Sequence, residues 1–387
     1  MRILHLEFDH VKLFKDGIFT FDFFAENRVP KEDESVTLLD RPIYHNNVIA
    51  IAGVNASGKT TVLKLLGAAL DILKGFAPSA DLCSLFEKQT TAHILFWSRG
   101  KTYLLNAHLV EDQQAVARDG RSALRFASEI LYRIDGTLQK KHLLDITTIQ
   151  GMPNCHLVEN RQTLEEEKHL LLGDDGSIVR ILHDAPGSLF IDAFDHPGSI
   201  GQVTGSMDEI LRTFDPSIEH IEIHNTDSFN LRFAHSDEEL RLSAAGIEKV
   251  LSSGTLKGHA LIRRVFMALS YGSYCLVDEI EVHLNKQLVA VIIELFSSHE
   301  TNPHGAVLVF TTHYPELLDC VHRKDNVYFV VRDNKHWMHL VKYSDRIARI
   351  ENKKSEVFLS NFIDGTAPNY SDVRALREEA KRLVLLS

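Results

Sequence analysis

Cysteine is scarce in this sequence, and long apolar runs are missing from it. The four cysteines, Cys83, Cys155, Cys275 and Cys320, lie far apart and form no Cys-x-x-Cys pair. This usage is typical of a reducing compartment and argues against both a disulfide framework and a zinc site. No stretch of 18 apolar residues occurs, and the opening residues MRILHLEFDH lack the pattern of a signal peptide. We therefore expect a cytoplasmic protein without a membrane segment.

Positive charge is in deficit. The 387 residues include 42 Lys and Arg against 53 Asp and Glu, which gives a formal net charge of -11. Proteins that bind nucleic acid over a whole surface are usually basic, so the net charge disfavours that class of protein. The net charge is still compatible with nucleic acid bound in a local basic groove. Hydrophobic residues make up 44% of the chain and charged residues 25%, which allows a sizeable buried core. The length predicts two or three domains, or one large domain with an insertion.

Repeats, low-complexity tracts and long heptad runs are also absent from the sequence. The residue pattern instead indicates alternating elements. Apolar residues alternate on both sides of a turn at residues 15–17, as in a hairpin, whereas the polar segment 26–47 is expected to be a loop. The apolar run Val48–Ala52 is typical of a strand buried on both faces, and helical spacing then continues to Gly75.

Two further regions follow, which differ in the secondary structure that their residue patterns predict. Short alternating runs between residues 91 and 242, including 130–132 and 178–180, predict antiparallel strands, with a helix near 163–172. Strands and helices alternate after residue 246, which predicts a parallel sheet. The predicted elements there are helices over 257–269, 286–297 and 371–385, strands over 274–277 and 306–311, and a closing hairpin at 327–331 and 338–341. We divide the chain into an N-terminal lobe (1–110), an inserted arm (111–240) and a C-terminal lobe (241–387).

The strongest motif is Gly53-Val54-Asn55-Ala56-Ser57-Gly58-Lys59-Thr60, which fits the phosphate-binding pattern G-x-x-x-x-G-K-[ST]. Glycines let backbone N–H groups wrap a phosphate, and the following helix start favours negative charge. Lys59 is expected to reach the β- and γ-phosphates, and Thr60 to place its hydroxyl on Mg²⁺. The nucleotide-binding residues predicted here are Gly53, Asn55, Ala56, Ser57, Gly58, Lys59, Thr60 and Thr61.

Two carboxylates end the apolar run 274–277. Asp278 is expected to hold Mg²⁺, and Glu279 to orient and deprotonate an attacking water. Adjacent side chains at a strand end point to opposite sides, so the two can serve different roles. An exposed acidic turn after a buried strand would give the same pattern, and the phosphate loop upstream favours the functional interpretation.

A serine- and glycine-rich segment, 251–258, precedes the helix predicted over 257–269. Ser252, Ser253 and Gly254 at a helix start would suit an anion, although an ordinary capped helix has the same composition. This segment lies about 25 residues before Asp278. Its position in the order of the motifs favours the anion-binding interpretation over an ordinary capped helix.

The order of these motifs resembles that of an ABC-type ATPase. Residues 53–60 resemble its Walker A loop and residues 251–258 its signature motif. Asp278-Glu279 resembles the end of its Walker B strand, and Thr311-Thr312-His313 its switch histidine. The signature reads Leu-Ser-Ser-Gly-Thr, which is similar to the soluble branch: SMC-like and RecF-like proteins, and OLD-like AAA-family ATPases of bacterial phage-defence loci. The runs DEIEVHL, from Asp278, and EILY, from Glu129, are most similar to the defence branch. The resemblance covers most of the chain and is weakest over residues 112–227.

This resemblance implies a P-loop NTPase head of the ABC type, with a mainly parallel core sheet, an antiparallel β subdomain and an inserted mixed α/β arm. It implies ATP and Mg²⁺ as cofactors, and a homodimer that pairs head to tail around ATP. Ser253 and Gly254 of one subunit would contact the γ-phosphate held by Lys59 of the other. The catalytic residues would be Glu279 and His313, with Thr60 and Asp278 as metal ligands.

Several features leave the resemblance incomplete. Gln89 is a weak candidate for the family's Q-loop glutamine, and the roles of Lys257 and His283 are open. Only 74 residues follow His313, too few for the nuclease domain of OLD proteins, and no heptad run provides SMC-type arms.

Three functions remain in competition. The first is the ATPase subunit of an anti-phage system, which controls a co-encoded effector. The second is a RecF-like or SMC-like DNA-repair ATPase, for which bound nucleic acid is possible. The third is the nucleotide-binding half of a transporter, which the signature variant disfavours.

Overall fold

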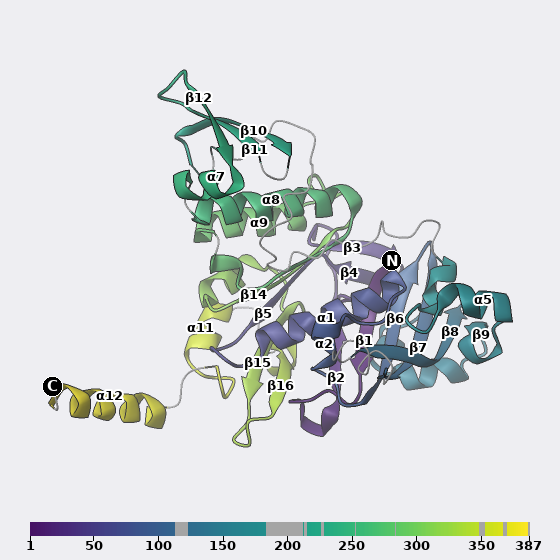
Figure 1. The fold of residues 1–387 in the computed structure, drawn as a ribbon. Coiled ribbons are helices and arrows are strands. Elements are labelled where there is room, and N and C mark those ends of the chain that lie inside the picture. The colour runs from purple at the N-terminus through teal and green to yellow at the C-terminus, as the bar shows by residue number, and fades with distance from the viewer. Residues whose placement is uncertain are drawn as a thin grey trace.

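The computed structural model describes residues 1–112, 123–182, 212, 215–225, 228–251, 253–282, 284–347, 353–366 and 370–385. The fold is mixed α/β, and its main core forms where two large sheets pack against one helix, α1 (Lys59–Lys74) (Figure 1). Eleven of the sixteen residues of α1 are buried, among them the small residues Gly67, Ala68 and Ala69. Small side chains let the sheets approach the helix closely, so α1 is held on most of its circumference.

The first sheet carries the phosphate loop. Its strand order is β13 (Tyr274–Val277), β14 (Val307–Thr312), β5 (Val48–Ala52), β15 (Val327–Arg332) and β16 (Met338–Lys342), and the first four strands are parallel. In β5, Ile49 and Ile51 pack toward α1, whereas Val48, Ala50 and Ala52 pack toward α8 (Ser253–Tyr271) and α9 (Lys286–Ser297). Burial on both faces explains why β5 is apolar at every position.

The second sheet is antiparallel and has the strand order β2-β1-β6-β7-β8-β9. Its strands are β1 (Arg2–Phe8), β2 (Phe19–Asp22), β6 (Gln89–Ser98), β7 (Lys101–Glu111), β8 (Leu124–Ile134) and β9 (Cys155–Asn160). The hairpin predicted around residues 15–17 is therefore confirmed. This sheet includes strands from both sides of residue 110, where we drew a domain boundary from the sequence, and that boundary stays a proposal.

Two local predictions are wrong. Segment 26–47, expected to be a loop, contains the hairpin β3 (Val36–Asp40) and β4 (Ile43–Asn46). Val36 and Ile43 are buried there, but each strand is too short for a period-2 pattern to stand out. The run at 178–180, expected to be a strand, lies in the 3₁₀ helix η4 (Ile178–Leu182), where Ile178 and Val179 pack into the main core.

A small three-stranded sheet stands apart from the two large ones (Figure 1). It consists of β10 (Ile218–Asn225), β11 (Ser228–Phe233) and β12 (Glu239–Ser243), and β12 continues directly into α7 (Ala244–Val250). Its core joins Ile218 and Leu231 of the sheet to Ile247 and Leu251 of the α7 segment. Ser253, the first residue of α8, follows Leu251 by two positions.

Short helices complete the described chain. They are α2 (Ala80–Cys83), α4 (Lys140–Leu144), α5 (Glu166–Leu172), α10 (Tyr343–Arg346), α11 (Lys354–Leu359) and the 3₁₀ helices η1 (Lys15–Gly17), η2 (Ile146–Gly151), η3 (Arg161–Thr163), η5 (Ile280–Val282) and η6 (Pro315–Cys320). The last helix, α12 (Tyr370–Leu385), projects away from the body (Figure 1). None of the helices in the described ranges combines the length and apolar character needed to cross a membrane.

Candidate functional site

The loop from Gly53 to Gly58 joins β5 to α1. Ala56 (φ 59°) and Gly58 (φ 113°) both adopt the left-handed region, which turns successive backbone N–H groups inward as in an anion nest. A Cβ on Gly53 would lie 2.6 Å from the Val330 carbonyl oxygen, and one on Gly58 would collide with the Met338 side chain. The two glycines are therefore required by close packing as well as by backbone shape.

The first turn of α1 has no side-chain cap. Gly58 occupies the N-cap position, so no side chain there satisfies the N–H groups that open the helix. Asn55, Ala56 and Thr60 are exposed and Thr61 is half-buried, which leaves the mouth of the loop open to a ligand. Ser57 is buried, and its Oγ has no hydrogen-bond partner among the described residues. These features suit a phosphate chain at the helix start.

Lys59 is almost fully buried at the centre of the site. Its Nζ donates to the carbonyl oxygens of Gly53 (2.9 Å) and Val54 (3.1 Å), and to Nδ1 of His313 (3.1 Å). Burial lowers the pKa of Lys59, and the nearby carboxylates of Glu279, Asp278 and Glu281 oppose that shift. Three carboxylates thus surround one cation, which favours a second cation at this site.

Asp278 connects the phosphate loop to the two neighbouring strand ends. The Thr60 hydroxyl donates to Oδ2 of Asp278 (2.6 Å), and the Thr311 hydroxyl donates to Oδ1 (2.5 Å). The two predicted metal ligands, Thr60 and Asp278, are therefore in direct contact. Their oxygens fit Mg²⁺, which typically keeps several waters and takes one or two carboxylates from the protein. No cluster of three or more His, Cys, Asp and Glu side chains suited to a metal occurs among the described residues.

Glu279 is held by its backbone in an uncommon conformation. Its φ is 47°, and its N–H donates to Oγ1 of Thr311 (2.7 Å). The Oε1 of Glu279 lies 2.9 Å from Nε2 of His313. Left-handed backbone at a residue other than glycine costs free energy and is common at functional sites. The carboxylate of Glu279 points toward His313.

The contacts of His313 define its tautomer. A charged Lys59 ammonium can only donate, so Nδ1 of His313 accepts, and the ring proton resides on Nε2. Nε2 then donates to Glu279. The backbone N–H of His313 donates to Oε1 of Glu281 in a short contact. His313 thus connects the lysine to the predicted general base.

These groups meet because of the sheet order. The segments after β5, β13 and β14 all leave the same carboxyl edge, and β14 lies between the other two strands. That edge is where open α/β sheets usually bind ligands. The structure therefore brings together Lys59, Thr60, Asp278, Glu279 and His313.

The signature residues lie elsewhere. Ser253 and Gly254 begin α8, which covers the face of the core sheet opposite α1. Within one chain they do not join the Lys59 cluster. Lys257 is exposed on the same helix, and Gln89 is the exposed first residue of β6, with its amide 3.5 Å from the ring of His10. Ser252 and His283 lie outside the described residues.

Sequence reasoning missed three members of the site. Thr311 bridges Asp278 and the Glu279 backbone, Glu281 accepts from His313, and Arg332 Nε donates to the Ala56 carbonyl (2.9 Å). The sequence offered a signal for the first two, because Thr311 and Thr312 directly precede His313 and Glu281 follows Glu279 by two residues. Arg332 carried none, because its contact depends on β15 lying beside β5.

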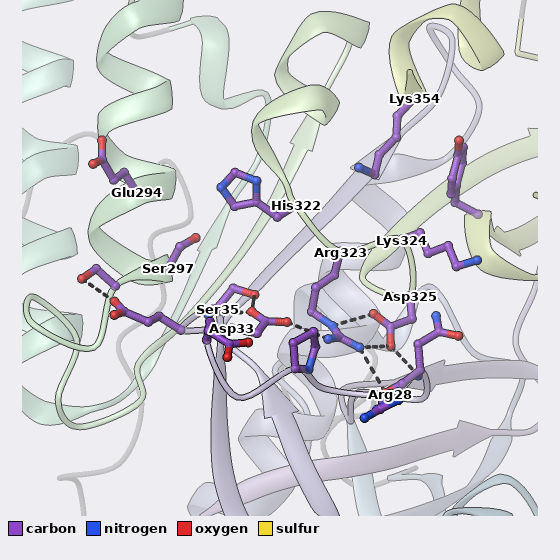
Figure 2. A pocket seen from close by; sticks show the side chains of 16 residues that line it. Arg28, Asp33, Ser35, Glu294, Ser297, His322, Arg323, Lys324, Asp325 and Lys354 are labelled. Atoms are coloured by element: carbon purple, nitrogen blue, oxygen red, sulfur yellow. Dashed lines mark hydrogen bonds and ion pairs between the residues drawn. The ribbon is translucent and has the colours of Figure 1, made fainter. Parts of the chain in front are cut away.

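A separate cavity of about 610 Å³ lies at the other edge of the core sheet (Figure 2). It is lined by residues just before β15 and at the end of α9, so it faces the amino ends of the strands. The buried Arg323 on its floor pairs with Asp325 (2.6 Å) and Asp33 (2.8 Å). This cavity is not part of the Lys59 cluster, and its only buried guanidinium among the described residues is already paired.

This chain matches solved structures but no known sequence family. No protein-family model matches this chain, and no curated protein matches it. Among solved structures, the chain is similar to the SMC head domain from Thermotoga maritima at 13% identity, with a TM-score of 0.42. The match covers 88% of this chain and 99% of that one. Its function is therefore inferred from its own residues.

Proposed function

We propose that this protein binds and hydrolyses ATP as an ABC-type head with Mg²⁺. The observation that carries the proposal is the meeting of Lys59 and Thr60 with Asp278, Glu279 and His313 at one sheet edge. A buried lysine at a helix start, next to a threonine–aspartate pair, suits a nucleotide's phosphates and their metal.

Each residue has a role in this proposal. Lys59 binds the β- and γ-phosphates, and backbone N–H groups of the loop wrap them. Thr60 and Asp278 hold Mg²⁺, which when bound would neutralise charge on the phosphate oxygens. Glu279 accepts a proton from the attacking water, and His313 orients the carboxylate of Glu279. A γ-phosphate would compete with His313 for Lys59, so nucleotide binding reorganises the Lys59–His313–Glu279 chain.

The site of one chain is incomplete without a second copy. Ser253 and Gly254 start α8, which packs on the face of the core sheet opposite α1, and the resemblance implies that they contact the γ-phosphate held by another subunit. We therefore propose a homodimer that pairs head to tail around two ATP molecules. The Leu251–Thr255 and Asp278–Leu284 segments resemble those of ATPases from phage-defence loci. On that resemblance, we propose that the protein is the sensor ATPase of an anti-phage system and controls a separate effector. A RecF-like DNA-repair ATPase is the competing role.

A pair of substitutions tests the enzymatic proposal. Glu279→Gln should bind ATP, hydrolyse it at least about a hundredfold more slowly and accumulate as an ATP-bound dimer. Lys59→Ala should lose nucleotide binding. Native mass and phosphate release measure both, with Glu316→Gln, an exposed glutamate three residues past His313, as the matched control. Wild-type hydrolysis by Glu279→Gln would refute the assignment of the base.

The biological role needs a second experiment. The tagged chain is coexpressed with its neighbouring open reading frames, and its native mass is measured in ATP and Mg²⁺. A stable complex with a neighbouring gene product favours the defence role. A bare dimer whose hydrolysis rises with DNA in a salt-dependent way favours the DNA-repair role.

A further inference from the structure

Glu281 is a charged residue of the site to which the proposed reaction gives no role. It lies in η5, two residues after Glu279, and its side chain reaches from the segment after β13 to the segment after β14. There Oε1 accepts the backbone N–H of His313. Because a carboxylate–amide contact is charge-assisted, it is stronger than an ordinary backbone bond and fixes where the histidine backbone lies.

The other oxygen of Glu281 is unusual. Oε2 is buried and has no hydrogen-bond partner among the described residues. A buried carboxylate oxygen without a donor is unfavourable, so such groups call for an explanation. The charge of Glu281 also acts on Lys59, together with those of Glu279 and Asp278. Glu281 therefore contacts the middle member of the Lys59–His313–Glu279 chain through the backbone of His313, and it influences the Lys59 end through its charge.

The local packing shows where the other hydrogen bonds of this strand end go. The Thr311 hydroxyl oxygen already accepts the N–H of Glu279 and donates its proton to Asp278. After Thr311 and Thr312 the strand ends, and the Thr312 hydroxyl accepts the N–H of Tyr314. The N–H of His313 is left between these bonds, and Glu281 is its acceptor.

We infer that Glu281 is a positioning residue, which holds the backbone of His313 so that its ring stays within hydrogen-bond reach of Glu279 when nucleotide takes its place on Lys59. This inference rests on the proposed ATPase function and adds a residue to it. Glu281 acts through His313 and does not itself take a proton from water. Loss of its acceptor should therefore affect the chemical step, and should affect ATP binding little.

The test compares two substitutions. Glu281→Gln keeps an amide oxygen for the His313 N–H, and its kcat should stay within about threefold of the wild type. Glu281→Ala removes the acceptor, and kcat should fall about tenfold, while the Kd for ATP changes by less than about twofold. Glu316→Ala, at an exposed position nearby, is the control. Equal losses in the Gln and Ala variants, or a change mainly in Kd, would overturn the inference.

A double substitution asks whether Glu281 acts through the histidine. In a His313→Ala background, Glu281→Ala should cost less than about twofold further, because residues that act as a unit are not additive. A further tenfold loss would show that Glu281 acts independently of His313, and the inference would fail.

A nucleotide-free readout separates this inference from the proposed function. Protein labelled with ¹⁵N-histidine should show His313 as the tautomer with its proton on Nε2, assigned by the signals lost in His313→Ala. Glu281→Ala should shift these signals, and Glu316→Ala should not. Unshifted signals overturn the inference whatever the ATPase result. Shifted signals in a protein that hydrolyses no ATP would refute the ATPase and keep the positioning contact.

Discussion

Thr311 offers the sharpest test of how the site is built. This buried residue donates to Asp278 Oδ1 and accepts from the Glu279 N–H, so one hydroxyl aligns both carboxylates. Thr311→Val has nearly the same shape but lacks the hydroxyl. The Glu279 N–H then loses its partner at a residue whose φ is 47°.

The expected magnitude follows from these two bonds. An orphaned buried N–H costs about 1–3 kcal/mol, and a bond to a carboxylate contributes about 1.5–3 kcal/mol. Asp278 keeps its contact with Thr60, which offsets part of the second loss. We therefore expect Thr311→Val to lower the free energy of unfolding by about 2–4 kcal/mol. Displacement of Glu279 should also lower kcat by roughly ten- to a hundredfold, since about 1.4 kcal/mol corresponds to a factor of ten.

The assay is urea unfolding combined with phosphate release. Thr312→Val is the matched control, because this neighbouring buried threonine accepts only the N–H of the exposed Tyr314, which water can satisfy in its place. It should cost about 1 kcal/mol or less and leave kcat near the wild-type value. Equal effects of the two valine substitutions on kcat would refute the role given to Thr311.

Three further predictions concern the loop, the metal and pH. Gly53→Ala should destabilise the fold by about 1–3 kcal/mol in urea and weaken ATP binding, because the added methyl meets the Val330 carbonyl 2.6 Å away; unchanged values would contradict the packing. Removal of Mg²⁺ by a chelator should weaken ATP binding at least about tenfold in calorimetry, because three carboxylates oppose one lysine. Burial raises the pKa of Glu129 to about 7, despite its hydrogen bonds to Ser177 and Arg161. Between about pH 4.5 and 7 the folded protein therefore binds a proton at Glu129 that the unfolded protein does not bind. Stability carried by this group should thus fall as pH rises through that window, and Glu129→Gln should flatten the fall in thermal melts; an unaltered slope would contradict it.

Much of the core sheet could be predicted from the sequence, because each of its elements is marked by a local pattern. The strand at 274–277 and the helix at 286–297 have the predicted bounds, and α1 ends at the predicted Gly75. A strand buried on both faces and a helix with one apolar face are each visible within a short window. The prediction of a strand at 178–180 was wrong because its two apolar residues, Ile178 and Val179, are too few to separate a strand from a 3₁₀ turn.

The site was predictable only in part. Lys59, Thr60, Asp278 and His313 each follow an apolar strand, and that placement is written in the sequence. Their contacts depend on which strands are neighbours, and the order β13-β14-β5 is not encoded in any spacing. Side chains that join two strand ends, such as Thr311 and Glu281, therefore appear only in three dimensions.

The small sheet of β10–β12 has a mechanical consequence. Leu251 is buried in the core of that sheet, and two residues later Ser253 begins α8. Because only one residue separates the two, we expect a rotation of the small sheet to displace the first turn of α8, and a contact on that first turn to act on the small sheet in return. A partner bound to the small sheet would then act on the residues that the proposed second head would use to close on ATP.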